Sequence, residues 1–225
     1  MADDYSAGFS GYQAYDDSLD NPWRGVDLQV QAIWTAISLD YGLSYINPPP
    51  SYSENAQRLR TPSRILDERR GTCVDLALLM AACLEWVEIY PVIFNLNDHA
   101  FPGYWRSSGD YVEFQSNPQI IHDDANSQDS SSDQLRNRNF WPWSSLRSAY
   151  PEIRSHVLDR KHRLASLIPM ETVGLTSRTG FSSAVEQAKE YFAQSMSDDF
   201  YSMIDICRSR SQVTPIPLSA MRRTQ

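Results

Sequence analysis

Apolar residues recur at helical spacing in two long segments of the first half of the chain. Between Val26 and Leu43 they predict one helix, for which Gly42 is the expected stop. A second helix is predicted from Cys73 to about Glu88, with Thr72 as its N-cap and Asp75 completing a capping box. Its buried stripe consists of Leu76, Leu79, Met80, Cys83, Leu84 and Val87.

Proline and glycine set the boundaries of the shorter elements. Three prolines at 48–50 break regular structure after a short extended piece at Tyr45-Ile46. A short helix is predicted from Thr61 to Arg70, with Pro62 in its first turn and Gly71 as its end. Later helices are expected over 155–166, from Phe181 onward after Gly180, and over 198–209.

Runs of β-branched and aromatic residues predict a sheet between these helices. Tyr90–Leu96 is typical of a buried strand, and His99–Arg106 is expected to pair with it as a hairpin. We expect Tyr111–Phe114 to extend this sheet and Leu167–Leu175 to supply a further strand. The pattern favours an α+β fold, with N-terminal helices packed on an antiparallel β-sheet.

Composition changes along the chain predict its organisation. Residues 1–22 are rich in Gly, Ser, Tyr and Asp without a period, and indicate a flexible leader or a docking arm. A single domain is expected over 23–218, with an insertion at 115–163 that begins in an Asn-, Asp-, Gln- and Ser-rich stretch. The aromatic cluster at Phe140–Trp143 is expected to dock on the body, and residues 219–225 form a tail.

Charge and cysteine content exclude several classes of protein. A net charge of -8 argues against nucleic acid or an anionic membrane as the partner. No stretch approaches the roughly 18 apolar residues of a membrane helix, and the acidic N-terminus does not resemble a signal peptide, so we expect a cytoplasmic protein. Three cysteines without a CxxC pair, and histidines without metal-ligand spacing, predict neither a disulfide framework nor a metal or cofactor.

Cys73 is the first candidate for chemistry because it is expected at the first position of a helix. The free N–H groups and the positive dipole end there lower a thiol pKa and can stabilise an oxyanion. His99, one helix and one strand further along the chain, could take the thiol proton. Cys73 could equally be a packing residue, and His99 a surface residue. Cys83 lies on the apolar stripe and is expected in the core.

A catalytic histidine needs an acceptor that orients its ring. Glu171, a charged residue in an apolar segment, is one candidate, although it could instead face water from an edge strand. Asp98 is a competing orienter, but a side chain next to His99 in a strand would point to the opposite face. Three other histidines, His122, His156 and His162, lie in or near the insertion and have weaker claims.

Taken together, these residues resemble the transglutaminase-like cysteine hydrolase superfamily. The resemblance rests on 71–77 (Gly-Thr-Cys-Val-Asp-Leu-Ala), on 99–101 (His-Ala-Phe) and on Glu171. It covers roughly 31–105 and resumes over 168–218, and the stretch from Gln57 to Trp105 is similar to a bacterial subgroup found alone or beside helicase-type modules.

The resemblance implies a papain-like core and a Cys73-His99-Glu171 triad. The family more commonly has Asp in the third position, and its His-to-acid connection is shorter than the 72 positions that separate His99 from Glu171 here. The side chain of Gln57 could support an oxyanion hole, as an amide does in papain-like enzymes, and Thr72 is a second candidate for contact with substrate.

The implied activity is cysteine-dependent acyl transfer on a polypeptide, foremost as a peptidase or amidase acting on peptide or isopeptide bonds. A protein-glutamine deamidase or a transglutaminase would use the same site with another substrate or acceptor. No acidic loop with calcium-ligand spacing supports a metal requirement. The alternative outside enzymes is an inactive peptide-binding module in a larger assembly, such as a defence system.

Overall fold

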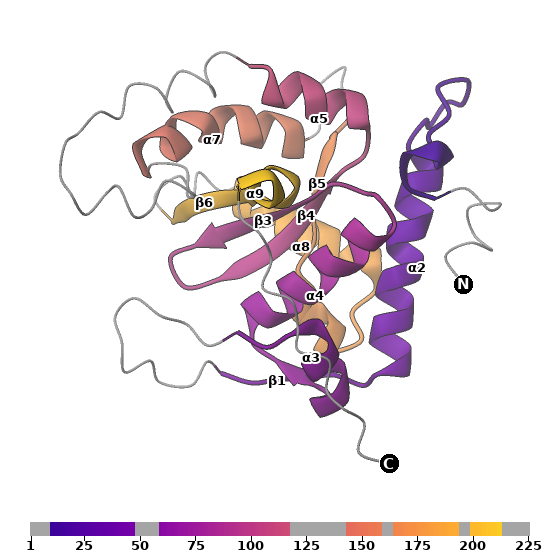
Figure 1. The fold of residues 1–225 in the computed structure, drawn as a ribbon, viewed down its shortest axis with the longest axis vertical. Coiled ribbons are helices and arrows are strands. Elements are labelled where there is room, and N and C mark those ends of the chain that lie inside the picture. The colour runs from indigo at the N-terminus through magenta and orange to yellow at the C-terminus, as the bar shows by residue number, and fades with distance from the viewer. Residues whose placement is uncertain (1–9, 48–58, 118–142, 159–163, 194–198, 213–225) are drawn as a thin grey trace.

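The computed structural model describes residues 10–47, 59–117, 143–158, 164–193 and 199–212 (Figure 1). Its centre is an antiparallel sheet with the strand order β5-β4-β3-β6. The strands are β3 (Pro91–Leu96), β4 (Ala100–Trp105), β5 (Leu167–Pro169) and β6 (Phe200–Asp205). A separate parallel pair joins β1 (Ser44–Tyr45) to β2 (Arg70–Gly71). The protein is therefore of mixed α+β class, as expected.

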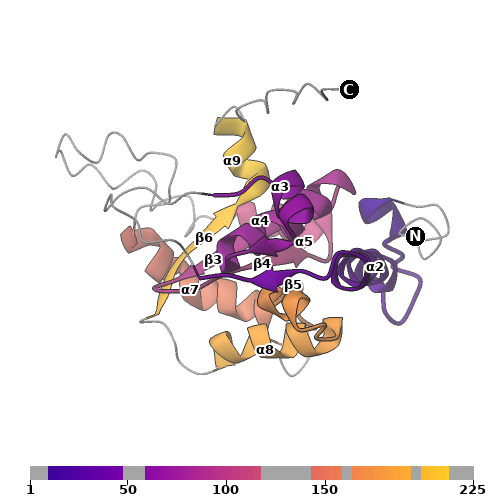
Figure 2. The same cartoon turned by 90° about the horizontal axis from the view of Figure 1, so that it is seen from below.

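Helices cover both faces of the sheet. Helix α4 (Cys73–Trp86) packs closely on one face, where Ala77 and Ala81 contact Ile93 and Ala100. Helices α7 (Trp143–Val157) and α8 (Phe181–Ala193) lie across the other face (Figure 2). This arrangement follows from strand alternation, because successive side chains of β3 and β4 point to opposite faces.

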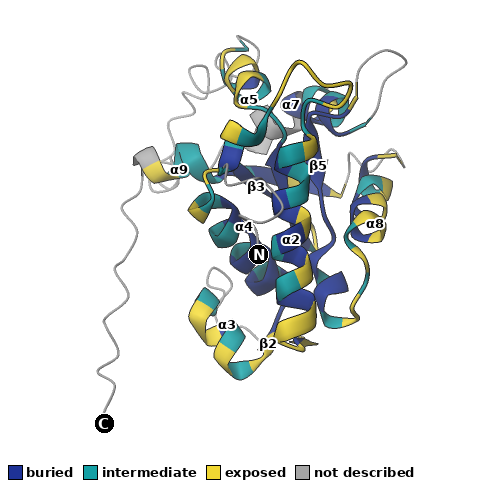
Figure 3. Ribbon diagram, turned by 90° about the vertical axis from the view of Figure 1, so that its right-hand side faces the viewer, coloured by how far each residue is buried: buried dark blue, intermediate teal, exposed yellow. Residues whose placement is uncertain are grey.

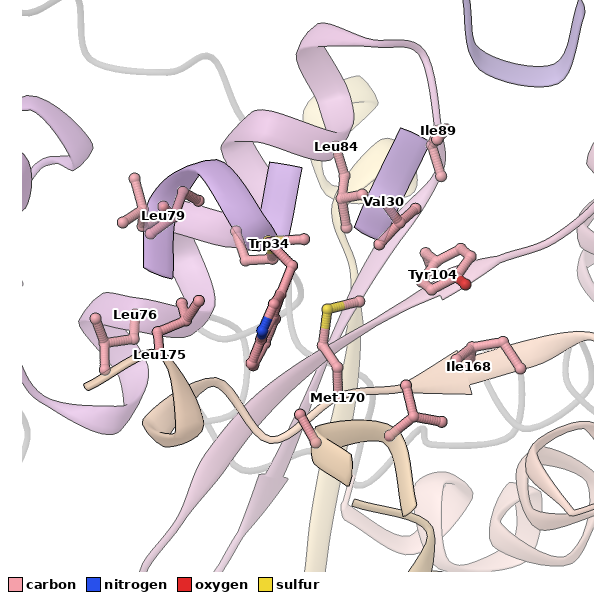
Figure 4. Close-up of a cluster of buried hydrophobic side chains, with 14 of the residues drawn as sticks. Val30, Trp34, Leu76, Leu79, Leu84, Ile89, Tyr104, Ile168, Met170 and Leu175 are labelled. Carbon is pink, nitrogen blue, oxygen red and sulfur yellow. The ribbon is translucent and has the colours of Figure 1, made fainter. Parts of the chain in front are cut away.

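A long helix, α2 (Arg24–Asp40), completes the core on the α4 side. Trp34 of α2 lies among buried side chains of α4, the sheet and the segment after β5 (Figure 4). The outer faces of α3 (Pro62–Glu68) and α8 remain exposed (Figure 3). The pattern of apolar positions in the sequence thus predicted α2 and α4 within a few residues of their ends, and Gly42 adopts the left-handed conformation just beyond α2.

The prediction of a helix over 198–209 was wrong. Phe200–Asp205 forms strand β6, which pairs with the edge of β3, and only Ile206–Gln212 is helical, as α9. Phe200, Met203 and Ile204 have helical spacing, but the free edge of β3 provides a hydrogen-bonding partner that local periodicity cannot reveal. Asp205 begins α9 by accepting the N–H of Arg208 at 2.9 Å.

Three other predicted boundaries were also wrong. Residues 108–115 form helix α5, begun by the Ser107 side chain, rather than a third strand with Tyr111–Phe114. The helix expected over 155–166 ends at Val157 as part of α7, so part of the expected insertion belongs to the core. Strand β5 stops at Pro169, and Thr172–Thr176 form the 3-10 helix η3.

Part of the expected flexible leader packs against the body. Residues 11–14 form the 3-10 helix η1, which is held by the Gln29 side chain through hydrogen bonds to both backbone groups of Gly11. The Tyr12 hydroxyl donates to the carbonyl of Trp105 at 2.9 Å and accepts the N–H of Tyr90 at 3.1 Å. Residues 1–9, 140–142 and 219–225 lie outside the described residues, and with them most of the aromatic cluster and all of the tail.

Candidate active site

Cys73 occupies the first position of α4, and the local sequence explains why the helix begins there. The Thr72 hydroxyl accepts the N–H of Asp75 at 3.3 Å, and the Asp75 carboxylate accepts the N–H of Thr72 at 3.0 Å. This is the predicted capping box. It leaves Cys73 at the positive end of a 14-residue helix, with its side chain 7% exposed.

His99 and Glu171 meet at one end of the sheet. His99 directly precedes β4, and Glu171 follows the end of the antiparallel neighbour β5, so strand pairing brings the two side chains together. Glu171 Oε2 lies 2.6 Å from His99 Nε2, and Glu171 Oε1 accepts the N–H of Val173 at 3.0 Å. Both oxygens are therefore used, and the imidazole is held in one orientation.

The identity of the orienting acid was left open by the sequence, and the geometry distinguishes the candidates. Glu171 is 8% exposed and contacts the ring, whereas Asp98 is exposed in the turn before His99. Glu171 does not lie within a strand, as was expected, but just beyond β5, where its side chain caps η3. The backbone is free to turn at that point, which directs the carboxylate toward β4.

Cys73 and His99 face each other across the interface between α4 and β4, close enough for each group to shift the pKa of the other. Because Glu171 engages Nε2, Nδ1 of the ring is left for the thiol. The backbone N–H groups of Ala100 and Val74 lie near the sulfur and also lower the pKa of Cys73. A thiol, an imidazole and a carboxylate thus form one connected chain, with backbone donors gathered at the sulfur.

The contacts of the Cys73–His99 pair favour its charged form. Burial opposes the thiolate, but the hydrogen bond and charge of His99 and the two N–H donors outweigh it and lower the pKa of Cys73. Burial likewise opposes the imidazolium, yet hydrogen bonds to Cys73 and Glu171 and their charges raise the pKa of His99 to about 10. The two shifts act in the same sense, since each favours the charged form of its group.

The pKa values of the other two thiols are shifted in the opposite direction to that of Cys73. Burial raises the pKa of Cys83, which packs against the main core as expected. Burial and the negative charges of Asp205 and Glu85 raise the pKa of Cys207 to about 11. Of the three cysteines in the chain, Cys73 alone has a lowered thiol pKa.

The remaining predicted site residues lie away from this chain of contacts or outside the described residues. Thr72 is 2% exposed and uses its hydroxyl to cap α4, so it supports Cys73 and does not face a substrate. His156 is buried beside Trp105 and bonds Ser166 at 2.8 Å. Gln57, His122 and His162 lie outside the described residues.

Two tyrosines at the site were not predicted. Tyr45 is 40% exposed, and its hydroxyl lies close enough to Cys73 for burial and the charge of the thiol to raise the pKa of Tyr45. Strand β1 places it there, because Tyr45 is paired with Gly71, two residues before Cys73. Tyr191 of α8 lies 5.7 Å from the His99 ring, centroid to centroid, and stacks on Phe101. Neither tyrosine stands in a recognisable motif, and both are brought to the site by tertiary packing alone.

Two further observations concern metal binding and membrane insertion. No group of three or more His, Cys, Asp or Glu side chains in the described ranges is arranged to hold a metal ion. Across those same ranges, no helix is long and apolar enough to cross a membrane. Comparison with protein-family models, with curated proteins and with solved structures found no match.

Proposed function

We propose that this protein is a transglutaminase-like cysteine acyl-transfer enzyme that cleaves amide bonds of a polypeptide. The observation that carries the proposal is the grouping of Cys73, His99 and Glu171, with 2.6 Å between His99 Nε2 and Glu171 Oε2 and with Cys73 close enough to the ring to shift its pKa. A helix bearing the nucleophile packed on an antiparallel sheet bearing the base and the acid is the core that the sequence resemblance implies.

In the proposed reaction, the Cys73 thiolate attacks the carbonyl carbon of the amide. The carbonyl π electrons move to oxygen, and backbone N–H groups at the first turn of α4 stabilise the oxyanion. The oxyanion collapses, the C–N bond breaks, and the imidazolium of His99 gives its Nδ1 proton to the departing amine. Glu171 keeps the ring aligned and stabilises its positive charge, as the carboxylate does in other triads.

Deacylation reverses these roles. Neutral His99 takes a proton from water, the resulting hydroxide adds to the thioester carbonyl, and the thiolate of Cys73 leaves as the acid product forms. An amine in place of water would give transamidation, and a glutamine side chain as substrate would give deamidation. Hydrolysis is the simplest outcome because water needs no second binding site.

A peptide carrying a thiol-reactive group, such as a vinyl sulfone, tests the proposal. We expect one adduct per chain, located on Cys73 by peptide mapping at pH 7, and strongly slowed labelling in His99→Ala. Cys83→Ser and Cys207→Ser are matched controls that should label like the wild type. Melting curves confirm that each variant is folded.

Two results would contradict the proposal. Labelling of Cys207 in preference to Cys73 would show that the lowered thiol pKa has no chemical consequence. A Cys73 that labels at the same rate with and without His99 would show that the imidazole does not activate it. Labelling as expected, but without turnover of any peptide in a diverse library, would favour the alternative of a peptide-binding module.

A further inference from the structure

Asp75 is a fully buried carboxylate two residues after the nucleophile. Its Oδ1 accepts the backbone N–H of Arg60 at 2.8 Å, and its Oδ2 accepts Arg60 Nη1 at 2.9 Å and the N–H of Thr72 at 3.0 Å. One side chain therefore joins the first turn of α4 to the chain segment that precedes α3. The capping box required only the contact with Thr72, so the two contacts with Arg60 need a separate explanation.

The charge of Asp75 opposes the charge that Cys73 carries in the proposed reaction. Both residues belong to the first turn of α4 and both are buried, so water screens their charges weakly, and a negative charge nearby raises the pKa of a thiol. Arg60 places a guanidinium on the same carboxylate, with its own side chain only 18% exposed. The two opposite charges of the ion pair therefore nearly cancel in their effect on the Cys73 sulfur.

We propose that Arg60 is a positioning residue whose charge cancels that of Asp75 and so keeps Cys73 ionised. This inference rests on the proposed role of Cys73 as the nucleophile. Without the guanidinium, Asp75 retains two backbone N–H donors and its place at the positive end of the helix. An uncompensated carboxylate would then stand beside the thiolate.

Other charged or titratable groups around Cys73 come from every element packed against it. His99 from the start of β4 and Tyr45 from β1 lie beside the sulfur, and Glu171 before η3 holds His99. From α3, Glu68 lies 3.6 Å from Arg60 Nε and also pairs with Arg64. Of these groups, Glu68 is the one that contacts Arg60. When Arg60 is replaced, Glu68 keeps Arg64 and Arg70 as partners.

The pH dependence of alkylation of Cys73 by iodoacetamide, followed by mass spectrometry, tests this inference. In Arg60→Gln we expect the acid-side inflection to move up by about one pH unit, which slows alkylation about tenfold below the inflection. Adding Asp75→Asn to Arg60→Gln removes both charges and should restore the rate to within about threefold of wild type. Arg64→Gln removes an arginine of α3 that does not contact Asp75, and it should leave the profile unchanged.

A purely structural role for Arg60 would give a different result. It predicts that the double variant is at least as impaired as Arg60→Gln, and that outcome overturns the inference, as does an unshifted profile in Arg60→Gln. If Arg60→Gln does not fold by circular dichroism, Asp75→Asn alone decides: an inflection at lower pH supports the inference, and one at the same or higher pH overturns it. Alkylation requires no turnover, so a failure of the proposed function would be seen separately. In that case amide substrates would not be cleaved, although the alkylation profiles were as expected.

Discussion

Replacing Glu171 with glutamine changes the charge beside His99 while nearly preserving its shape. The carboxamide oxygen can still accept the N–H of Val173, so the cap of η3 is retained. The amide nitrogen, however, can only donate to His99 Nε2, which must then carry no proton. The neutral ring is left with its proton on Nδ1, toward Cys73, and in that tautomer it cannot accept a proton from the thiol or from water.

The size of the effect follows from the contact. An opposite charge within about 4–6 Å shifts a pKa by about 1–3 units, or about 1.4–4 kcal/mol. The two side chains are only 18% and 11% exposed, so water screens them weakly. We therefore expect the pKa of His99 to fall from about 10 to roughly 7–9 in the variant. Together with the wrong tautomer, this should lower kcat/KM at neutral pH by about 10²–10⁴-fold.

The assay is kcat/KM for a peptide amide from about pH 5 to pH 11. The imidazolium is lost as the pH rises through the pKa of His99, so the alkaline limb lies near pH 10 in the wild type and at lower pH in Glu171→Gln. Glu190→Gln, an exposed carboxylate on α8, is the matched control and should leave the limb in place. An alkaline limb at the same pH in Glu171→Gln and wild type would refute the reasoning.

Four other substitutions have defined outcomes. Cys73→Ser should reduce turnover by more than about 10³-fold while the melting temperature stays within a few degrees of wild type, and a large loss of stability would indicate a packing role. Tyr45→Phe removes the hydroxyl beside the sulfur and should lower kcat/KM about fivefold to tenfold at neutral pH. An unchanged kcat/KM would show that the hydroxyl takes no part in the reaction. Thr72→Ala should cost about 0.5–2 kcal/mol in urea unfolding through loss of the cap of α4. Phe94→Ala, at a position without exposed surface, should cost about 3–5 kcal/mol in the same experiment, and less than 1 kcal/mol would contradict its place in the core.

Those parts of the fold that depend on local signals could be predicted from the sequence. The N-terminus of α4 was predicted to the residue because Thr72 and Asp75 form a cap within four positions. The β3–β4 hairpin was predicted because its two strands are adjacent in sequence. Strand β6 was not, because it exists through its pairing with β3, more than 100 residues earlier in the chain. The isolated sequence of Phe200–Asp205 is equally compatible with a helix.

The candidate site also has residues that local signals predicted and residues that they did not. Cys73 and His99 were proposed from a helix start and a strand start, and Glu171 from its charge within an apolar segment, before the family resemblance grouped the three. Tyr45, Tyr191 and Arg60 reach the site through a two-residue strand, a helix on the opposite face of the sheet and a buried ion pair. No periodicity or spacing marks such residues, since each depends on contacts between elements that are distant along the chain.

The register of β4 and β5 has a consequence for engineering. Trp105 pairs with Leu167, so the chain leaves β4 and returns to β5 at the end of the sheet remote from His99 and Glu171. The length of the connection between these strands therefore does not affect how the base and the acid meet. Helices α5 and α7 lie within this connection and pack on the core, so a reporter or a second domain inserted between the two helices, and not within them, would leave that alignment intact.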